Sequence, residues 1–167
     1  MLITTSRKPS QRTRSFGRAL ERVLPARYIN RGKMSLRDVY LKAQELNFTT
    51  VMVISERNGN PSRLEFYNGG DEAESYLLIS VDLSLPSGRV DTKKLGIKCE
   101  SPSLDNILIP LFELEEKDVP NNNLLWIKKT EDERMVMEFY DNKGILIRPR
   151  IYLRDWKGVA NGNSAGS

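Results

Sequence analysis

The clearest functional signal in this 167-residue chain is a cluster of Lys and Arg side chains near its start. Residues 1–37 contain ten Lys or Arg and a single acid, Glu21, whereas the remaining 130 residues carry a net charge of −5. The overall charge of +4 therefore hides a strongly basic segment on a mildly acidic body. This asymmetry favours an anionic partner bound at one end of the protein.

Three arginines of this segment, Arg14, Arg18 and Arg22, are four residues apart and lie along one face of the helix predicted there. Like charges at this spacing destabilise a helix by about 0.2–0.5 kcal/mol per pair. A polyanion along the stripe would turn this repulsion into affinity through counterion release. The alternative is a solvated cationic face, but three arginines in register favour nucleic-acid binding.

The candidate nucleic-acid contacts lie in the basic segment or flank the turn at residues 58–61. Lys and Arg side chains would contact phosphates, hydroxyls near a helix start would add donors, and an aromatic ring could stack on an unpaired base. The candidates are Arg7, Lys8, Ser10, Arg12, Thr13, Arg14, Arg18, Arg22, Tyr28, Arg31, Lys33, Arg37, Arg57 and Arg63. Phe16 stands at an apolar position of the predicted helix and is expected to pack in the core.

Three helices and a set of strands must position these side chains. Apolar spacing predicts helices over residues 9–24, from a cap at Ser35 to residue 46, and from a cap at Ser101 to about residue 111. Alternating or β-branched runs predict strands at residues 2–4, 27–29, 49–55, 63–67, 75–85, 124–129, 134–140 and 145–156. Pro149 in the last run indicates an edge position or a bulge.

The absent residues exclude several kinds of active site. Without histidine and with one cysteine, Cys99, the chain cannot form the usual Ser-His-Asp or Cys-His systems or a Cys/His zinc site. It has no glycine-rich phosphate loop, so no cofactor is predicted. The acids Asp71, Glu72 and Glu74 could hold Mg²⁺, but acids on a predicted turn are more ordinarily solvated. A single cysteine excludes an internal disulfide and fits a reducing cytoplasm.

Three stretches resemble the Brix domain family in its short, stand-alone archaeal form. They are TTSRKPSQRTRSFGRALERVL with RYINRGKMSLRDV, VISERNGNPSRLEFY at residues 53–67, and IYLRDW at residues 151–156. Together they cover almost the whole chain up to Trp156. The resemblance implies a ribosome-biogenesis factor that binds precursor ribosomal RNA, whereas charge and spacing alone indicate only a polyanion partner.

We predict an α/β fold in which a mixed β-sheet is covered by helices. Residues 86–94 have the composition of a linker, and LGIKCESPSLDNIL after it echoes LITTSRKPSQRTRSF near the start. The Brix resemblance implies two similar halves, about 1–86 and 87–157, each like the anticodon-binding domain of class II aminoacyl-tRNA synthetases. Residues 1–157 are expected to form one Brix domain, and residues 158–167 a disordered tail.

The function expected from the resemblance is non-catalytic binding of ribosomal RNA during ribosome assembly or processing. Ribosome-assembly proteins are possible partners, whereas a membrane and a small-molecule substrate are not expected. Two alternatives stay open. One is a general nucleic-acid chaperone or DNA-binding protein, and the other is a metal-dependent RNA-processing enzyme that uses Asp71, Glu72 and Glu74.

Overall fold

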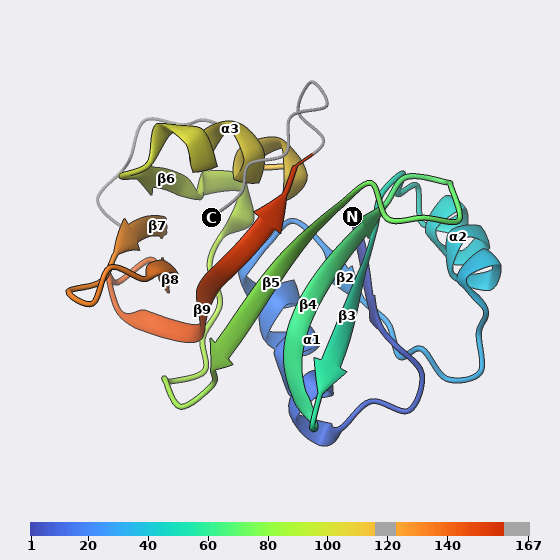
Figure 1. Cartoon of the computed structure of the whole chain (residues 1–167). Helices are drawn as coiled ribbons and strands as arrows, with labels where there is room; N and C mark the ends of the chain where they lie inside the picture. The colour runs from blue at the N-terminus through green and yellow to red at the C-terminus, as the bar shows by residue number, and fades with distance from the viewer. Residues whose placement is uncertain (116–122, 159–167) are drawn as a thin grey trace.

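A nine-stranded mixed β-sheet with three α-helices makes up the protein in a computed structural model that describes residues 1–115 and 123–158 (Figure 1). The first five strands are β1 (Leu2–Thr5), β2 (Arg27–Tyr28), β3 (Val51–Arg57), β4 (Asn60–Tyr67) and β5 (Ser75–Asp82). The remaining four are β6 (Gly96–Cys99), β7 (Leu124–Lys129), β8 (Met135–Tyr140) and β9 (Leu146–Lys157). The helices are α1 (Gln11–Val23), α2 (Leu36–Glu45) and α3 (Pro102–Leu111), and a short 3₁₀ helix spans Thr92–Lys94. The predicted mixed sheet with three covering helices is therefore confirmed.

The strand order β2-β1-β3-β4-β5-β9-β8-β7-β6 has the same pairing pattern on both sides of its centre. Strand β1 pairs in parallel with β3, and β3–β4 and β4–β5 are antiparallel. Likewise β6 pairs in parallel with β7, and β7–β8 and β8–β9 are antiparallel. The two sets meet where β5 pairs antiparallel with β9. Helix α1 follows β1 as α3 follows β6, so the two helices hold corresponding places.

Two apolar clusters show which helix covers which face of the sheet. Phe16 and Leu20 of α1 and Leu108 of α3 belong to one buried cluster together with Ile3 and Met52. The neighbouring residues Leu2, Val51 and Val53 belong instead to a cluster with Val39 and Ala43 of α2. Successive residues of a strand point to opposite faces. Helices α1 and α3 therefore cover one face, and α2 covers the other face beside β1 and β3.

Local capping explains where the first two helices begin. The Ser10 side chain accepts a hydrogen bond from the Thr13 backbone N–H at the start of α1. Ser35 and Asp38 form the reciprocal capping box that the sequence indicates for α2. Pro102 occupies the first turn of α3, but its N-cap Ser101 makes no side-chain capping bond. The predicted cap is therefore confirmed at Ser35, whereas α1 begins two residues after the predicted start at residue 9 and the predicted cap Ser101 makes no capping bond.

The central strands differ from the sequence expectation in two places. Strand β4 begins at Asn60, so Pro61 is paired in the strand instead of lying in the loop. Pro149 lies at a register irregularity of β9, between the pairs Phe139–Ile147 and Met137–Ile151. Strand β9 is hydrogen-bonded on both sides, so the bulge alternative is confirmed and the edge alternative is wrong.

Candidate nucleic-acid interface

The carboxyl ends of three parallel strands bring distant basic residues to one edge of the sheet. Strands β2 and β3 both run parallel to β1, so all three end at the same edge (Figure 1). The residues that follow or end these strands, or that lie at the adjacent start of α2, form what we call the basic edge: Arg7, Lys8, Arg31, Lys33, Arg37 and Arg57. Helices α1 and α2 begin at this edge because they follow β1 and β2. The positive ends of both helix dipoles lie at this edge, where the Glu56 and Asp38 carboxylates accept hydrogen bonds from the Ser10 and Ser35 backbone N–H groups.

A second basic group, the α1 stripe, runs along the outer side of α1. It consists of Arg14, Arg18 and Arg22, of which Arg18 is exposed and the other two are partly exposed. The ring of Tyr28 on the edge strand β2 packs directly against this helix. A Cβ atom at Gly17 would lie 2.4 Å from the Tyr28 Cε2 atom, so only glycine allows this approach. Burial raises the pKa of Tyr28, and the nearby charges of Arg18 and Arg14 partly oppose that rise.

None of the ten basic residues between positions 7 and 37 forms an ion pair with another residue that the structure describes. The Arg31 guanidinium instead donates to the carbonyl oxygens of Thr5 at 3.0 Å and Met34 at 2.8 Å. Burial lowers the pKa of Arg31, and the positive charge of Arg7 lowers it further. Hydrogen bonds and, to a lesser extent, the charges of Arg37, Arg14 and Arg12 lower the pKa values of Asp38, Glu56 and Asp82, but none of these carboxylates lies within ion-pair distance of a basic residue at positions 7–37.

Two predicted hydroxyl contacts have structural roles at the start of α1. Thr13 is completely buried, and its hydroxyl donates to the Glu56 carboxylate. The Ser10 hydroxyl donates to the Gly59 carbonyl at 2.7 Å, and the Ser10 backbone N–H donates to Glu56 at 3.0 Å. These bonds from Thr13 and Ser10 lower the pKa of Glu56. Thr13 thus cannot reach a phosphate in this structure, and the Ser10 hydroxyl is already engaged.

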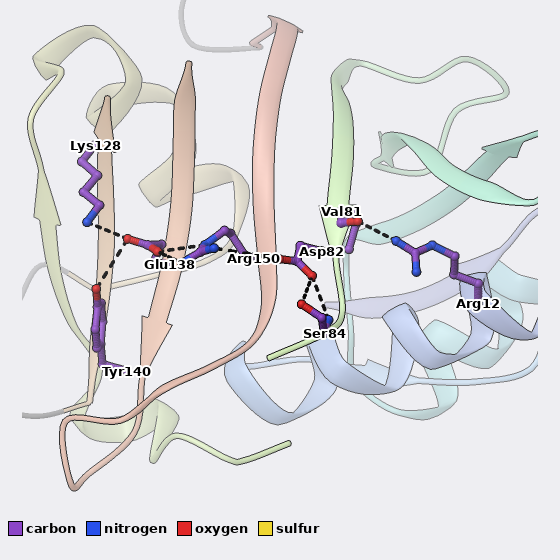
Figure 2. Close-up of polar contacts among 8 residues, drawn as sticks. All are labelled: Arg12, Val81, Asp82, Ser84, Lys128, Glu138, Tyr140 and Arg150. Atoms are coloured by element: carbon purple, nitrogen blue, oxygen red, sulfur yellow. Dashed lines mark hydrogen bonds and ion pairs between the residues drawn. The ribbon is translucent and has the colours of Figure 1, made fainter. Parts of the chain in front are cut away.

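Two predicted arginines are also used within the fold. Arg12 donates to the Val81 carbonyl at 2.7 Å, beside Asp82 at the junction of the two halves (Figure 2). Arg63 on β4 lies with its guanidinium carbon 4.3 Å from the Tyr76 ring centre and its Nε atom 3.8 Å from Glu65. It is therefore held by strand neighbours and is not part of the basic edge. Both arginines were predicted to contact RNA from the sequence, because their contacts with Val81 and Tyr76 join residues that are far apart in the chain.

Arg89 is a basic residue near the α1 stripe that sequence reasoning missed. It is exposed, and together with Arg18, Glu21, Arg22, Tyr28 and Asn30 it lines a pocket of about 400 Å³. Its position in a Pro-, Ser- and Gly-rich linker gave no periodic signal. Only the docking of that linker against α1 brings Arg89 to the basic surface.

The acidic residues of the alternative metal site are exposed on the turn between β4 and β5. Among the described residues, no group of three His, Cys, Asp or Glu side chains is arranged to hold a metal ion. Four further acids, Glu113, Glu115, Glu116 and Asp118, follow α3 in the sequence, and the last two lie outside the described residues. The expected tail at 158–167 also lies outside them, apart from Gly158. No helix in the described part of the chain is long and apolar enough to cross a bilayer.

Several known proteins are similar to this chain in sequence and in fold. No protein-family model matches the sequence. A probable Brix domain-containing ribosomal biogenesis protein of Methanothermobacter thermautotrophicus is 37% identical over 157 residues, which cover 94% of this chain and 98% of that protein. A protein of the same description from Archaeoglobus fulgidus is 41% identical over 159 residues, with 90% and 94% of the two chains covered.

Two solved structures share the fold. The crystal structure of an archaeal Imp4-like protein has a TM-score of 0.78 and 37% sequence identity, and the match covers 95% of this chain and 99% of that one. The crystal structure of a probable ribosomal biogenesis protein from Aeropyrum pernix has a TM-score of 0.72 and covers 91% and 93% of the two chains. At 24% identity the second match speaks for the fold alone.

Proposed function

This chain belongs to the Brix domain family of ribosomal biogenesis proteins, and on that premise we propose that it binds precursor ribosomal RNA as a non-catalytic assembly factor. The observation that carries the proposal is the set of ten basic residues at positions 7–37, none of which has an ion-pair partner in the described chain. Phosphates of an RNA would neutralise these cations and release counterions.

The RNA would lie along the α1 stripe and the basic edge. We assign phosphate contacts to the members of the basic edge and the α1 stripe, all of which are exposed or partly exposed: Arg7, Lys8, Arg14, Arg18, Arg22, Arg31, Lys33, Arg37 and Arg57. Tyr28 between the two groups would stack on an unpaired base, since its ring is only partly buried.

The finer architecture is part of the same proposal. We infer that the chain is one domain of residues 1–157 with halves at about 1–86 and 87–157, each resembling the anticodon-binding domain of class II aminoacyl-tRNA synthetases. The repeated strand pairing around β5 and β9 supports this division. The protein would act in the cytoplasm, and ribosome-assembly proteins are its expected further partners.

The test is a fluorescence-anisotropy titration of ribosomal RNA fragments over a salt series. For about five neutralised phosphates of single-stranded character, log K should fall with log salt at a slope of roughly −3.5. The triple variant Arg14→Ala, Arg18→Ala, Arg22→Ala should bind more weakly, with a slope shallower by about 2. A matched control removes three exposed cations from the other half, Lys129→Ala, Lys143→Ala and Arg154→Ala.

The outcomes separate this function from its alternatives. Equal loss of affinity in the two triple variants, or none in either, would contradict the assigned surface. Equal affinity of the wild type for ribosomal RNA, random RNA and duplex DNA would favour a general nucleic-acid chaperone or DNA-binding protein. Cleavage of RNA that requires Mg²⁺ and disappears in an Asp71→Ala, Glu72→Ala variant would favour an enzyme.

A further inference from the structure

The linker between the two halves is fixed on both sides of Arg89. Before it, the Arg22 guanidinium donates to the Ser87 hydroxyl at 3.1 Å, and a Cβ atom at Gly88 would lie 2.6 Å from the Ile147 Cγ2 atom. After it, the Val90 backbone N–H donates to the Arg22 carbonyl at 3.0 Å, and the Val90 side chain is buried. Arg89 itself stays exposed. The linker therefore presents Arg89 at a defined place beside the end of α1.

The pocket beside Arg89 combines cations with hydrogen-bond acceptors. Arg18, Arg22 and Arg89 supply three guanidinium groups, and Glu21 is the one acid in the basic N-terminal segment. One Glu21 carboxylate oxygen accepts the Tyr28 backbone N–H at 3.3 Å, and the other has no partner among the described residues. The lining of the pocket thus combines three guanidinium groups with a carboxylate oxygen that has no partner among the described residues.

The combination of guanidinium groups and a carboxylate in this pocket fits a nucleotide better than an inorganic anion. The pocket lies at the C-terminal end of α1, where the helix dipole and Glu21 both oppose a free phosphate. A nucleotide has a phosphate for the arginines, N–H donors for the carboxylate and a flat base for the Tyr28 ring. Tyr28 is steadied for stacking because it packs on Gly17 and its hydroxyl donates to the Asn30 Oδ1 atom at 3.3 Å.

Among the RNA bases, guanine matches a carboxylate best. Its Watson–Crick edge carries two adjacent donors, the N1 proton and the N2 amino group, whereas the other three bases place an acceptor beside their donor. A carboxylate accepts only, and each of its oxygens has two lone pairs, so Glu21 can accept from both guanine donors while one oxygen also accepts the Tyr28 N–H. Glu21 would therefore discriminate against bases that present an acceptor to it.

We propose that the pocket formed by the end of α1, β2 and the linker binds one unpaired guanine nucleotide of the RNA. Glu21 accepts hydrogen bonds from the base, Tyr28 stacks on it, and Arg89 with Arg18 contacts its phosphate. This inference rests on the proposed function and deepens it, because the phosphate contacts of the basic edge and α1 stripe carry no sequence information by themselves.

The experiment compares short oligouridines that carry guanosine, inosine or adenosine at one position, by fluorescence anisotropy at low salt. Inosine lacks only the N2 amino group, so the wild type should bind the guanosine oligomer about tenfold more tightly than the inosine oligomer. Glu21→Gln should abolish this preference, because glutamine still accepts from Tyr28 but exchanges the free acceptor for a donor. Equal wild-type affinity for the guanosine and inosine oligomers, or no binding to any of them, would overturn the proposal.

Arg89→Ala tests the contribution of the linker independently. We expect about fivefold weaker binding of the guanosine oligomer, whereas Arg154→Ala, which removes an exposed arginine elsewhere, should leave binding unchanged. Equal behaviour of these two variants would also overturn the proposal. A wild type that binds ribosomal RNA fragments without preferring guanosine refutes only the pocket. A wild type that binds no RNA refutes the proposed function as well.

Discussion

In the N-terminal half the basic residues at positions 7–37 lack a carboxylate partner among the described residues, whereas in the C-terminal half Lys128 and Arg150 both contact Glu138. The distances are 2.7 Å in both ion pairs, and the Glu138 side chain is only 5% exposed. Figure 2 shows this contact network running across β7, β8 and β9 towards Asp82 on β5. The basic residues at positions 7–37 are thus free of ion pairs within the described chain, whereas Lys128 and Arg150 link three strands of the C-terminal half through Glu138.

The two corresponding helices differ in the same way. Helix α1 carries Arg12, Arg14, Arg18 and Arg22, whereas α3, PSLDNILIPL, carries no basic residue. In the C-terminal half, Lys98 and Lys128 lie 4.1 and 4.2 Å from the Trp126 ring centre, and Arg134 lies 4.3 Å from that of Tyr152. The two halves therefore share a strand-pairing pattern but differ in where their basic side chains lie and what those side chains contact. Strand pairing depends on backbone hydrogen bonds, so surface charge can diverge without changing it.

Among the substitutions that test this difference between the halves, we expect the largest change in stability at Glu138. Glu138→Ala leaves Lys128 and Arg150 without their shared partner, and we expect the free energy of unfolding to fall by about 3 kcal/mol. Urea denaturation measures this loss, with the exposed Glu131→Ala as control. Affinity for ribosomal RNA should not change. A variant of full stability that had lost RNA affinity would break the comparison.

A pH series gives an intermediate effect. Burial would raise the pKa of Glu138, but its bonds to Lys128 and Arg150 and their charges outweigh burial and leave the pKa below its ordinary value. Such a carboxylate stabilises the fold above its unfolded pKa of about 4.3 and loses that contribution as the pH falls through the folded pKa.

We therefore expect the stability of the wild type to fall more steeply below about pH 4.3 than that of Glu138→Gln. Urea titrations at successive pH values measure the two slopes. The other carboxylates with a lowered pKa, Asp38, Glu56, Asp82 and Asp132, are present in both proteins, so the difference between the two slopes reports on Glu138. Identical slopes would mean that Glu138 is not the stabilising acid of the C-terminal half.

The smallest effect is expected in the N-terminal half. Arg18→Ala removes the like-charge repulsion of Arg18 with Arg14 and Arg22, one helical turn away on either side. The free energy of unfolding should therefore rise by about 0.5 kcal/mol. RNA affinity should fall in the same variant. Thermal or urea unfolding measures this change, with Arg154→Ala as the control variant. A clear loss of stability would mean that Arg18 supports the fold in the way that Arg150 does.

Much of the fold could be predicted because its signals are local. The start of α2 follows from Ser35 as its predicted cap, and Phe16 is buried as its helical spacing indicates. Helix α1 begins at Gln11, two residues after the predicted start, because Ser10 is its N-cap. The strand boundaries were less accurate. The run at 75–85 was predicted as one strand, but β5 ends at Asp82, where Ser84 donates to the Asp82 carboxylate and turns the chain.

The sequence by itself determined the basic segment, the three helices, most strands and the family resemblance, because charge, capping and periodicity are properties of neighbouring residues. Only the tertiary structure decided that Thr13 is buried, that Arg12 and Arg63 bond within the fold, and that Arg89 joins the α1 stripe. These contacts join residues far apart in the chain, such as Arg12 with Val81 and Arg22 with Val90. Such contacts form because whole strands and helices pack together, and this packing sets distances between residues that no local sequence pattern encodes.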